Sequence, residues 1–512
     1  MARVKKEKTL TTAQQLGSII KSSRDIMRKD KGLSGDLDRL PQLTWLMFLK
    51  FLDDLELLRE DEATLSGERF KPVIEAPYRW RDWAIKEDGL TGDDLINFLT
   101  KDEAMRPDGT MGMGLIAYLR SLRGENGGNR RDVVSNVFSG ITNRMESGYL
   151  LREVINKINS IHFASSEELH TLGFLYESML REMRDAAGDS GEFYTPRPVI
   201  QFIVTVTDPK LGEVVLDPAC GTGGFLVEAY SHLEKGCKSV QDRELLQKSI
   251  VGGEAKPLPY LLVQMNLLLH GMEYPRITKG NSLDLKVTEI GDKDRVDIIM
   301  TNPPFGGEEE AGIKNNFPAD MQTAETALLF LQLIMRKLKR PSVTSKGGRA
   351  AVIVPNGTLF GDGVAARIKE QLLKEYNLHT IIKLPKGVFA PYSGIQTNVL
   401  FFDRSAGTKD VWYYEIPLPD GRKNYTMTKP LLFDEFEPCI EWWFNRHENE
   451  FAWKVQVDEL LNNNCNLDLK NPRANVDLES ISPEEILIGI IEQEKKVISL
   501  LEEIKTIISE KP

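Results

Sequence analysis

The sequence predicts an α/β protein in which a doubly wound, mostly parallel sheet follows a helical N-terminal domain and precedes a C-terminal helical tail. Three observations support this fold class. Apolar residues recur at helical spacing in the first third, β-branched runs alternate with helical stretches from about 190 to 420, and a heptad pattern marks the end. We expect a helical domain over 1–165, the sheet domain over 166–420, a peripheral or linker region over 421–482, and a partner-binding helix over 483–512.

The composition is that of a globular protein, since 41% of the 512 residues are hydrophobic and 28% are charged. No apolar run approaches the roughly 20 residues that cross a bilayer, and the basic N-terminus lacks the apolar stretch of a secretory signal. The four scattered cysteines predict a reducing cytoplasm and no structural zinc. The net charge of −11 argues against an unaided grip on a long stretch of DNA, although a basic stripe or partner could supply one.

The first 165 residues predict a helical bundle without catalytic groups of its own. Residues 13–28 and 43–58 carry apolar side chains at helical spacing. The segments 107–114 and 123–131 are rich in glycine and charge and are expected to be loops.

Short β-branched runs predict the strands of the sheet domain. They cover 214–216, 249–251, 296–300, 350–354, 379–382 and 398–402. Strands that alternate with helices form a parallel sheet with helices on both faces, and ligands bind at the carboxyl ends of such strands.

The C-terminal segment predicts a long helix with a short coiled-coil seam. Ile490, Val497 and Ile504 recur every seven residues. The seam could bind a partner helix or pack against its own domain, and the sequence leaves both open.

A glycine-rich turn, 217–225 (DPACGTGGF), follows the first predicted strand and opens a helix. Its glycines let the backbone approach a ligand, and free amides at the helix start bind a carboxylate or phosphate. The turn is not a P-loop, and it departs from the Gly-x-Gly-x-x-Gly pattern. Because Asp217 can receive a cationic group, the turn suits a zwitterionic amino acid better than a pyrophosphate. Glu254 ends the next strand, where a ribose diol is held, and 281–283 could flank an adenine ring.

A second turn, 301–307 (TNPPFGG), follows the buried strand 296–300. Two prolines remove two donors, so nearby carbonyls stay available as acceptors. The Asn302 side chain adds another acceptor, and Phe305 offers a flat apolar surface.

This set of groups suits methylation of an exocyclic aromatic amine, whose lone pair is delocalised into the ring. Two acceptors on its N–H bonds would localise the lone pair, and stacking of the base is worth about 1–3 kcal/mol. The amine could then attack a methyl sulfonium in line, by positioning and charge stabilisation. A base inside a duplex must first be flipped out.

These motifs resemble a known family. The segment 191–196 (GEFYTP), followed by the glycine-rich turn and then Asn-Pro-Pro-Phe, resembles the amino-methyltransferases of the γ order. The whole chain is similar to the modification subunit of type I restriction–modification systems, with residues 190–405 carrying the specific part. The resemblance implies a Rossmann-like S-adenosylmethionine-dependent core that methylates N6 of adenine in double-stranded DNA. It also implies partners, namely a DNA-specificity subunit, usually with two modification subunits, and a nuclease–translocase subunit.

The resemblance also implies site residues by position. The implied catalytic residues are Asn302, Pro303, Pro304 and Phe305. The implied S-adenosylmethionine-binding residues are Phe193, Tyr194, Thr195, Asp217, Gly221, Thr222, Gly223, Phe225, Glu254, Asn281, Ser282 and Leu283. An Asp is more usual than Asn281 in the family, and 386–389 and 396–398 resemble the later segment near the target base.

Other functions remain to be separated from this one. The same acceptor geometry would serve an RNA base or a protein glutamine, although the helical N-terminal region, the tail and the Phe variant favour DNA adenine. A non-catalytic scaffold is disfavoured by the two intact turns, and a fused restriction enzyme by the lack of a recognisable nuclease core. No P-loop or helicase-like set indicates a motor, and the six histidines form no metal or triad pattern.

Overall fold

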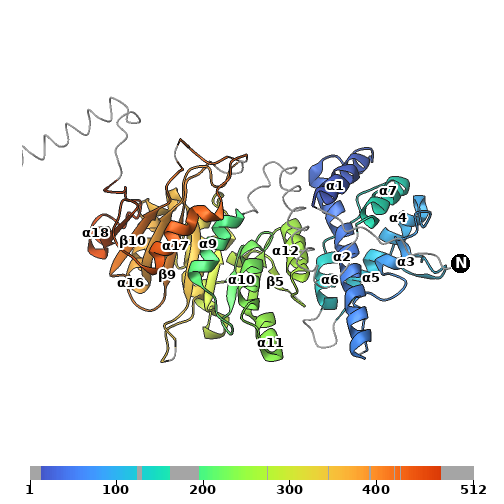
Figure 1. The fold of residues 1–512 in the computed structure, drawn as a ribbon, viewed down its shortest axis with the longest axis horizontal. Coiled ribbons are helices and arrows are strands. Elements are labelled where there is room, and N and C mark those ends of the chain that lie inside the picture. The colour runs from blue at the N-terminus through green and yellow to red at the C-terminus, as the bar shows by residue number, and fades with distance from the viewer. Residues whose placement is uncertain are drawn as a thin grey trace, which may run out of the picture.

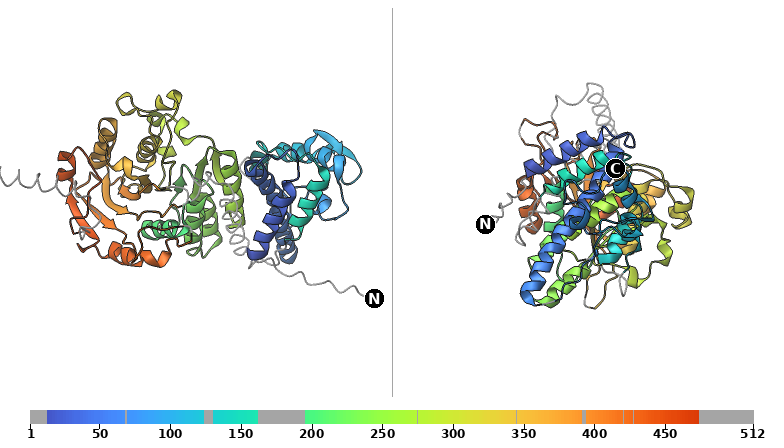
Figure 2. Two further views of the ribbon diagram at one scale, coloured as in Figure 1. Left: turned by 90° about the horizontal axis from the view of Figure 1, so that it is seen from above. Right: turned by 90° about the vertical axis from the view of Figure 1, so that its right-hand side faces the viewer.

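The computed structural model describes residues 13–67, 69–123, 130–161, 195–273, 275–343, 345–390, 394–419, 421–426 and 428–473. The expected helix over 483–512, its heptad seam, and the candidate site residues Phe193 and Tyr194 lie outside these ranges. The described chain forms a helical N-terminal lobe beside a larger lobe built on a sheet, as Figures 1 and 2 show. No helix in the described ranges is long and apolar enough to span a bilayer.

The N-terminal lobe is mainly helical, and the helices predicted over 13–28 and 43–58 are confirmed. Its elements are α1 (Ala13–Met27), α2 (Asp36–Ser66), α3 (Trp80–Trp83), α4 (Gly92–Thr100), β1 (Glu103–Met105), β2 (Met111–Met113), α5 (Leu115–Ser121), α6 (Arg130–Phe138) and α7 (Gly148–Asn159). Helix α2 buries Leu43, Leu46 and Phe51, and it ends where Gly67 adopts a left-handed conformation that caps the last turn.

The expected loop over 107–114 is wrong in part, because residues 111–113 form β2 and pair antiparallel with β1. Gly109 has a φ of 79° and permits the tight connection between the two short strands. Strands of three residues carry too little alternation to be recognised in a sequence.

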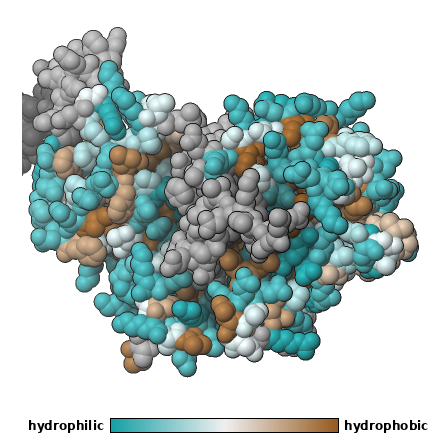
Figure 3. All heavy atoms as spheres, turned by 45° about the vertical axis from the view of Figure 1, so that its right-hand side comes forward, coloured by the Kyte–Doolittle hydropathy of each residue, from teal (hydrophilic) through white to brown (hydrophobic). Residues whose placement is uncertain are grey.

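Elsewhere on the surface, hydrophobic residues are scattered over a largely hydrophilic face (Figure 3).

The second lobe contains one nine-stranded sheet in the order β11-β10-β8-β9-β7-β6-β3-β4-β5. Its strands are β3 (Val215–Asp217), β4 (Ile250–Glu254), β5 (Arg276–Lys279), β6 (Ile298–Thr301), β7 (Arg349–Pro355), β8 (Asn377–Lys383), β9 (Thr397–Asp403), β10 (Asp410–Glu415) and β11 (Ala452–Gln456). All six predicted strands are present. Only β9 and β11 run antiparallel to their neighbours, so the sheet is mostly parallel, as predicted.

Helices cover both faces of this sheet. They are α9 (Arg197–Thr207), α10 (Gly224–Glu234), α11 (Val240–Ser249), α12 (Pro257–Leu269), α13 (Ala311–Lys314), α14 (Thr326–Lys337), α15 (Asn356–Leu359), α16 (Val364–Glu375), α17 (Glu437–Phe444) and α18 (Val457–Asn462). Successive β6 residues enter opposite cores: Ile298 and Met300 pack with α9 and α10, whereas Ile299 packs with α14 and α16. The doubly wound prediction is therefore confirmed.

The region expected to be peripheral, 421–482, contributes to the sheet itself. Strand β11 pairs with β10 at the sheet edge, and α17 packs near α9. Phe436, just before α17, stacks on Phe202 of α9 with ring centroids 4.5 Å apart. The sheet domain therefore extends past residue 420. The sequence did not predict this, because the added strand is only five residues long.

Candidate active site

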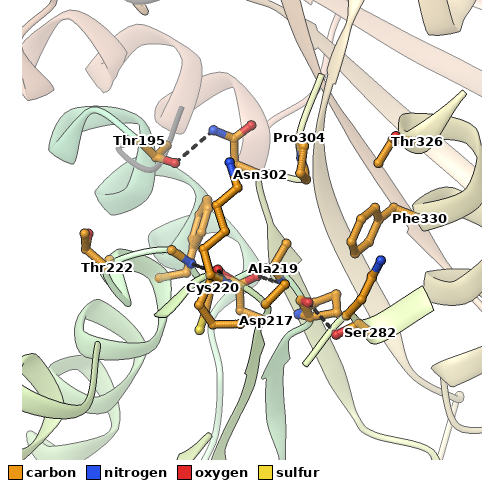
Figure 4. Close-up of a pocket in the computed structure, with 18 of the residues that line it drawn as sticks. Thr195, Asp217, Ala219, Cys220, Thr222, Ser282, Asn302, Pro304, Thr326 and Phe330 are labelled. Carbon is orange, nitrogen blue, oxygen red and sulfur yellow. Dashed lines mark hydrogen bonds between the residues drawn. The ribbon is translucent and has the colours of Figure 1, made fainter. Parts of the chain in front are cut away.

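A cavity of about 320 Å³ opens where β3, β4, β5 and β6 end (Figure 4). These neighbouring strands are parallel, so their carboxyl ends lie at one edge of the sheet. Asp217 ends β3, Glu254 ends β4, Asn281 follows β5 and Asn302 follows β6, and all four line the cavity. The two turns singled out from the sequence thus open on the same space.

The glycine-rich turn needs its glycines for backbone conformation and for packing. Gly221 and Gly223 have φ values of 53° and 84°, in the left-handed region. A Cβ at Gly223 would also meet the Val263 side chain at 2.6 Å. Helix α10 begins at Gly224, so unpaired amides at its first turn lie beside the cavity.

Asp217 is buried, and no described cation pairs with it. Its Oδ1 atom accepts hydrogen bonds from the Thr301 hydroxyl at 2.6 Å and from the Ala219 amide at 3.1 Å. Burial raises the pKa of Asp217 to about 7, although both hydrogen bonds act in the opposite direction. Oδ2 has no hydrogen-bond donor among the described residues and remains available to a ligand.

Glu254 connects the turns after β3 and β4. Its Oε2 accepts the Gly221 amide at 2.9 Å, and its Oε1 accepts the Lys256 amide at 2.8 Å. Burial raises the pKa of Glu254, while the backbone hydrogen bonds oppose that rise. Each carboxylate oxygen retains a second lone pair for a ligand hydroxyl.

The segment after β5 is tied to the glycine-rich turn. It forms the short 3₁₀ helix η3 (Ser282–Asp284), which Asn281 caps by accepting the Leu283 amide at 3.0 Å. The Ser282 hydroxyl donates to the Pro218 carbonyl at 2.6 Å. These bonds fix the cavity wall opposite α10.

Asn302 has one satisfied and one unsatisfied end. Its Nδ2 donates to the Thr195 hydroxyl at 3.0 Å, whereas its Oδ1 is shielded from solvent and has no partner among the described residues. A buried polar atom without a partner costs about 1–3 kcal/mol, so such atoms in native proteins need an explanation. An acceptor held open for a ligand donor is the explanation that the cavity supports.

The other residues of the second turn differ in burial and in whether they line the cavity. Pro303 is buried and Pro304 is exposed and lines the cavity. Phe305 does not line the cavity, and its ring meets Phe389 edge-on with centroids 5.8 Å apart. Phe389 belongs to the later segment 386–389, so the structure brings that segment against the turn 301–307.

Most of the candidate residues within the described ranges line the cavity. They are Thr195, Asp217, Gly221, Thr222, Phe225, Glu254, Asn281, Ser282, Asn302 and Pro304. Leu283 does not, because its side chain is fully buried in the core shared with α14. Gly223 does not line the cavity either, and it is the N-cap residue of α10.

Several lining residues were not predicted from the sequence. Arg197 follows the Thr-Pro pair directly, and that adjacency could have indicated it. Glu309 accepts a hydrogen bond from the Thr326 hydroxyl at 3.2 Å, and Phe330 reaches the cavity from α14. Phe330 sits in the apolar run 327–331 of α14, where the sequence gives no signal beyond core packing.

A buried carboxylate and an amide oxygen at one cavity can hold an ammonium group and an amine, which suits the class of amino-methyltransferases. Residues 167–480 match the family model "N-6 DNA Methylase", and residues 16–158 match "HsdM N-terminal domain". The chain therefore belongs to the N-6 DNA methylase family, the adenine-specific DNA methyltransferases.

Individual relatives agree along almost the whole length. The chain is 47% identical over 505 residues to the type I restriction enzyme EcoEI methylase subunit of Escherichia coli, covering 96% of this chain and 97% of that protein. It is similar to the crystal structure of a modification subunit assigned to a type I restriction enzyme of Vibrio vulnificus YJ016, with 68% identity, a TM-score of 0.87, and coverage of 93% and 100%. A structure from a study of type I R-M complex assembly gives 38% identity, a TM-score of 0.74, and coverage of 98% and 100%.

Proposed function

We propose that this chain transfers a methyl group from S-adenosylmethionine to N6 of a flipped-out adenine, as the modification subunit of a type I restriction–modification complex. One observation carries the proposal. Among the described residues, Oδ1 of Asn302 has no partner and the Asp217 carboxylate has no cation, and both residues line the same cavity. The first suits an amine donor, and the second suits the ammonium group of the cofactor.

The residues at the cavity fit S-adenosylmethionine. Asp217 would receive the ammonium group, the free amides of α10 the carboxylate, and Glu254 the ribose hydroxyls. Asn281 and Ser282 would border the adenine ring, and Thr195 the methionine end. When bound, the cofactor supplies an activated methyl group on a sulfonium centre.

The catalytic turn would activate the target amine without removing a proton beforehand. Asn302 Oδ1 and a main-chain carbonyl beside Pro303 would accept the two N–H hydrogens of the amine, which localises the nitrogen lone pair. Phe305, braced by Phe389, would stack on the base. Positive charge that develops on the nitrogen is stabilised by the same two acceptors.

The proposed partners follow from the family and from charge. A chain with a net charge of −11 needs help to hold duplex DNA, which a DNA-specificity subunit would supply. We propose a cytoplasmic complex of two copies of this chain with that subunit, joined by a nuclease–translocase subunit for restriction, with residues 483–512 as a partner contact.

The test is methyl transfer from labelled S-adenosylmethionine by the chain purified with the products of its neighbouring genes. DNA, RNA and protein substrates are offered in parallel. We expect label on N6 of adenine in DNA only. Label confined to RNA or to protein glutamine would establish a different substrate, and cofactor binding without transfer to any of the three would indicate a scaffold.

A further inference from the structure

The Asn302 amide is hydrogen-bonded to a neighbour from a distant part of the chain. We propose that Thr195 is a positioning residue, whose hydroxyl accepts from Nδ2 and holds the amide where Oδ1 can accept from the target amine. The inference rests on the proposed function and deepens it. It assigns Thr195 a role in the methyl-transfer step beyond contact with the cofactor.

The hydrogen bond joins two segments that are 107 residues apart in sequence. Nδ2 of Asn302 lies 3.0 Å from Oγ1 of Thr195, and Figure 4 shows the two side chains pointing toward each other. Thr195 lies next to Pro196, whose carbonyl accepts the amides of Val199 and Ile200 in the first turn of α9. Both of those side chains are buried in the core, so Thr195 sits on a fixed support.

An amide that is held at one end presents its other end from a fixed place. Nδ2 of Asn302 is held by the Thr195 hydroxyl, whereas Oδ1 has no partner among the described residues. A hydroxyl can accept or donate, so this bond fixes the place of the amide, and the N–H donors of the target amine then favour the orientation in which Oδ1 faces them. Without that hydroxyl, no side-chain hydrogen bond among the described residues would hold the amide there.

Thr195 also lines the cavity, so an effect on cofactor binding alone is the competing explanation. The two roles differ in how they depend on residue 302. A positioning role acts through the Asn302 side chain, because the hydrogen bond from Nδ2 is what transmits it. It should therefore disappear when Asn302 is replaced by alanine, whereas a cofactor-binding role should persist.

The experiment is a double-mutant cycle on the assembled complex, with single-turnover methyl transfer measured at saturating S-adenosylmethionine and DNA. The variants are Thr195→Val, Thr195→Ser, Asn302→Ala, and Thr195→Val combined with Asn302→Ala. Cofactor affinity is measured separately by calorimetry. We expect Thr195→Val to slow transfer about three- to tenfold, the effect of one neutral hydrogen bond. Thr195→Ser should stay within about twofold of the natural chain.

The result that supports the inference is a loss from Thr195→Val that falls below about twofold in the Asn302→Ala background. An equal loss in both backgrounds would overturn it, as would a change confined to cofactor affinity. An inactive natural complex would remove the proposed function and this inference together. A natural complex that is active while the cycle shows no coupling would remove the inference alone.

Discussion

Two buried aspartates, one in each lobe, differ in what surrounds them. Asp53 of α2 receives the Arg81 guanidinium at 2.9 Å, and that cation opposes the rise in pKa that burial causes. Asp217 at the end of β3 accepts hydrogen bonds from a hydroxyl and an amide, and no described cation lies close enough to oppose the effect of burial. Its pKa is raised to about 7. Both carboxylates are desolvated, yet among the described residues only the one in the helical lobe has a cation as a partner.

The difference indicates that the Asp53 carboxylate is buried for stability and the Asp217 carboxylate for binding a ligand. A buried charge normally has a partner, because an unpaired one costs several kcal/mol. Asp53 follows that rule and fastens α2 to α3, since Arg81 belongs to α3. Asp217 breaks the rule at a cavity, where a cationic ligand can complete the pair. Asn143 of the helical lobe has partners at both ends, whereas Asn302 has one at Nδ2 only among the described residues. Asn156 of the helical lobe also has an unpartnered Oδ1, so what sets Asn302 apart is its place in the lining of the cavity.

The largest expected effect comes from the amides. Asn302→Ala removes the open acceptor and should reduce methyl transfer about 100- to 1,000-fold, as loss of one preorganised transition-state contact does. Cofactor affinity should change little, because Oδ1 is assigned to the base. Single-turnover transfer and calorimetry measure the two quantities. Asn143→Ala is the matched control and should leave the transfer rate unchanged. Equal rates for Asn302→Ala and the natural chain would refute the assignment of Asn302.

Next in size is the exchange of the two aspartates for asparagine. Asp217→Asn should weaken cofactor binding about 10- to 100-fold, since a charge-assisted hydrogen bond contributes about 1.5–3 kcal/mol. Asp53→Asn should leave that affinity unchanged and alter stability instead. Calorimetric titration with S-adenosylmethionine compares them directly. If both substitutions weakened binding alike, the assignment of Asp217 as the partner of the cofactor's ammonium group would be contradicted.

The pKa of Asp217 sets a pH dependence. In the empty protein this carboxyl is protonated below about pH 7, whereas an ammonium group binds the ionised form. Affinity should therefore rise about tenfold per pH unit up to about 7 and level off above it. Stability follows the opposite sign. The raised pKa stabilises the folded chain below the unfolded value of about 3.9, and this contribution is lost as pH rises through about 7. Asp217→Asn should abolish both trends, and a pH-independent affinity in the natural chain would contradict the assignment.

The smallest effect on activity should come from the helical lobe. Arg81→Met leaves the Asp53 carboxylate without its cation and should destabilise the fold by about 1–3 kcal/mol. Urea unfolding followed by circular dichroism measures the loss. The transfer rate per folded molecule should stay the same, and a large drop in that rate would mean that this lobe takes part in catalysis.

The cavity could be predicted from the sequence where strand and turn coincide. Asp217, Glu254 and Asn302 each follow a β-branched run, and parallel strands necessarily bring their carboxyl ends together. The orientation of individual side chains could not be predicted in the same way. Leu283 and Ser282 are adjacent, yet Ser282 lines the cavity and Leu283 is buried in the core, because successive side chains of a 3₁₀ turn point about 120° apart.

Contacts between distant segments were also beyond sequence reasoning. The hydrogen bond from Asn302 to Thr195 and the approach of Phe330 depend on how α9 and α14 pack on opposite faces of the sheet. Strand β11 was missed because an edge strand of five residues, exposed at alternate positions, resembles a loop in composition. In each case tertiary packing decided the outcome.

The most direct test of the central claim is a structure of the assembled complex with a non-reactive S-adenosylmethionine analogue and a DNA target. The account predicts the analogue's ammonium group beside Asp217, and N6 of a flipped adenine within about 3.2 Å of Asn302 Oδ1, a hydrogen-bonding distance. An analogue bound away from this cavity, or an adenine whose amine faces the opposite side of the sheet, would contradict it.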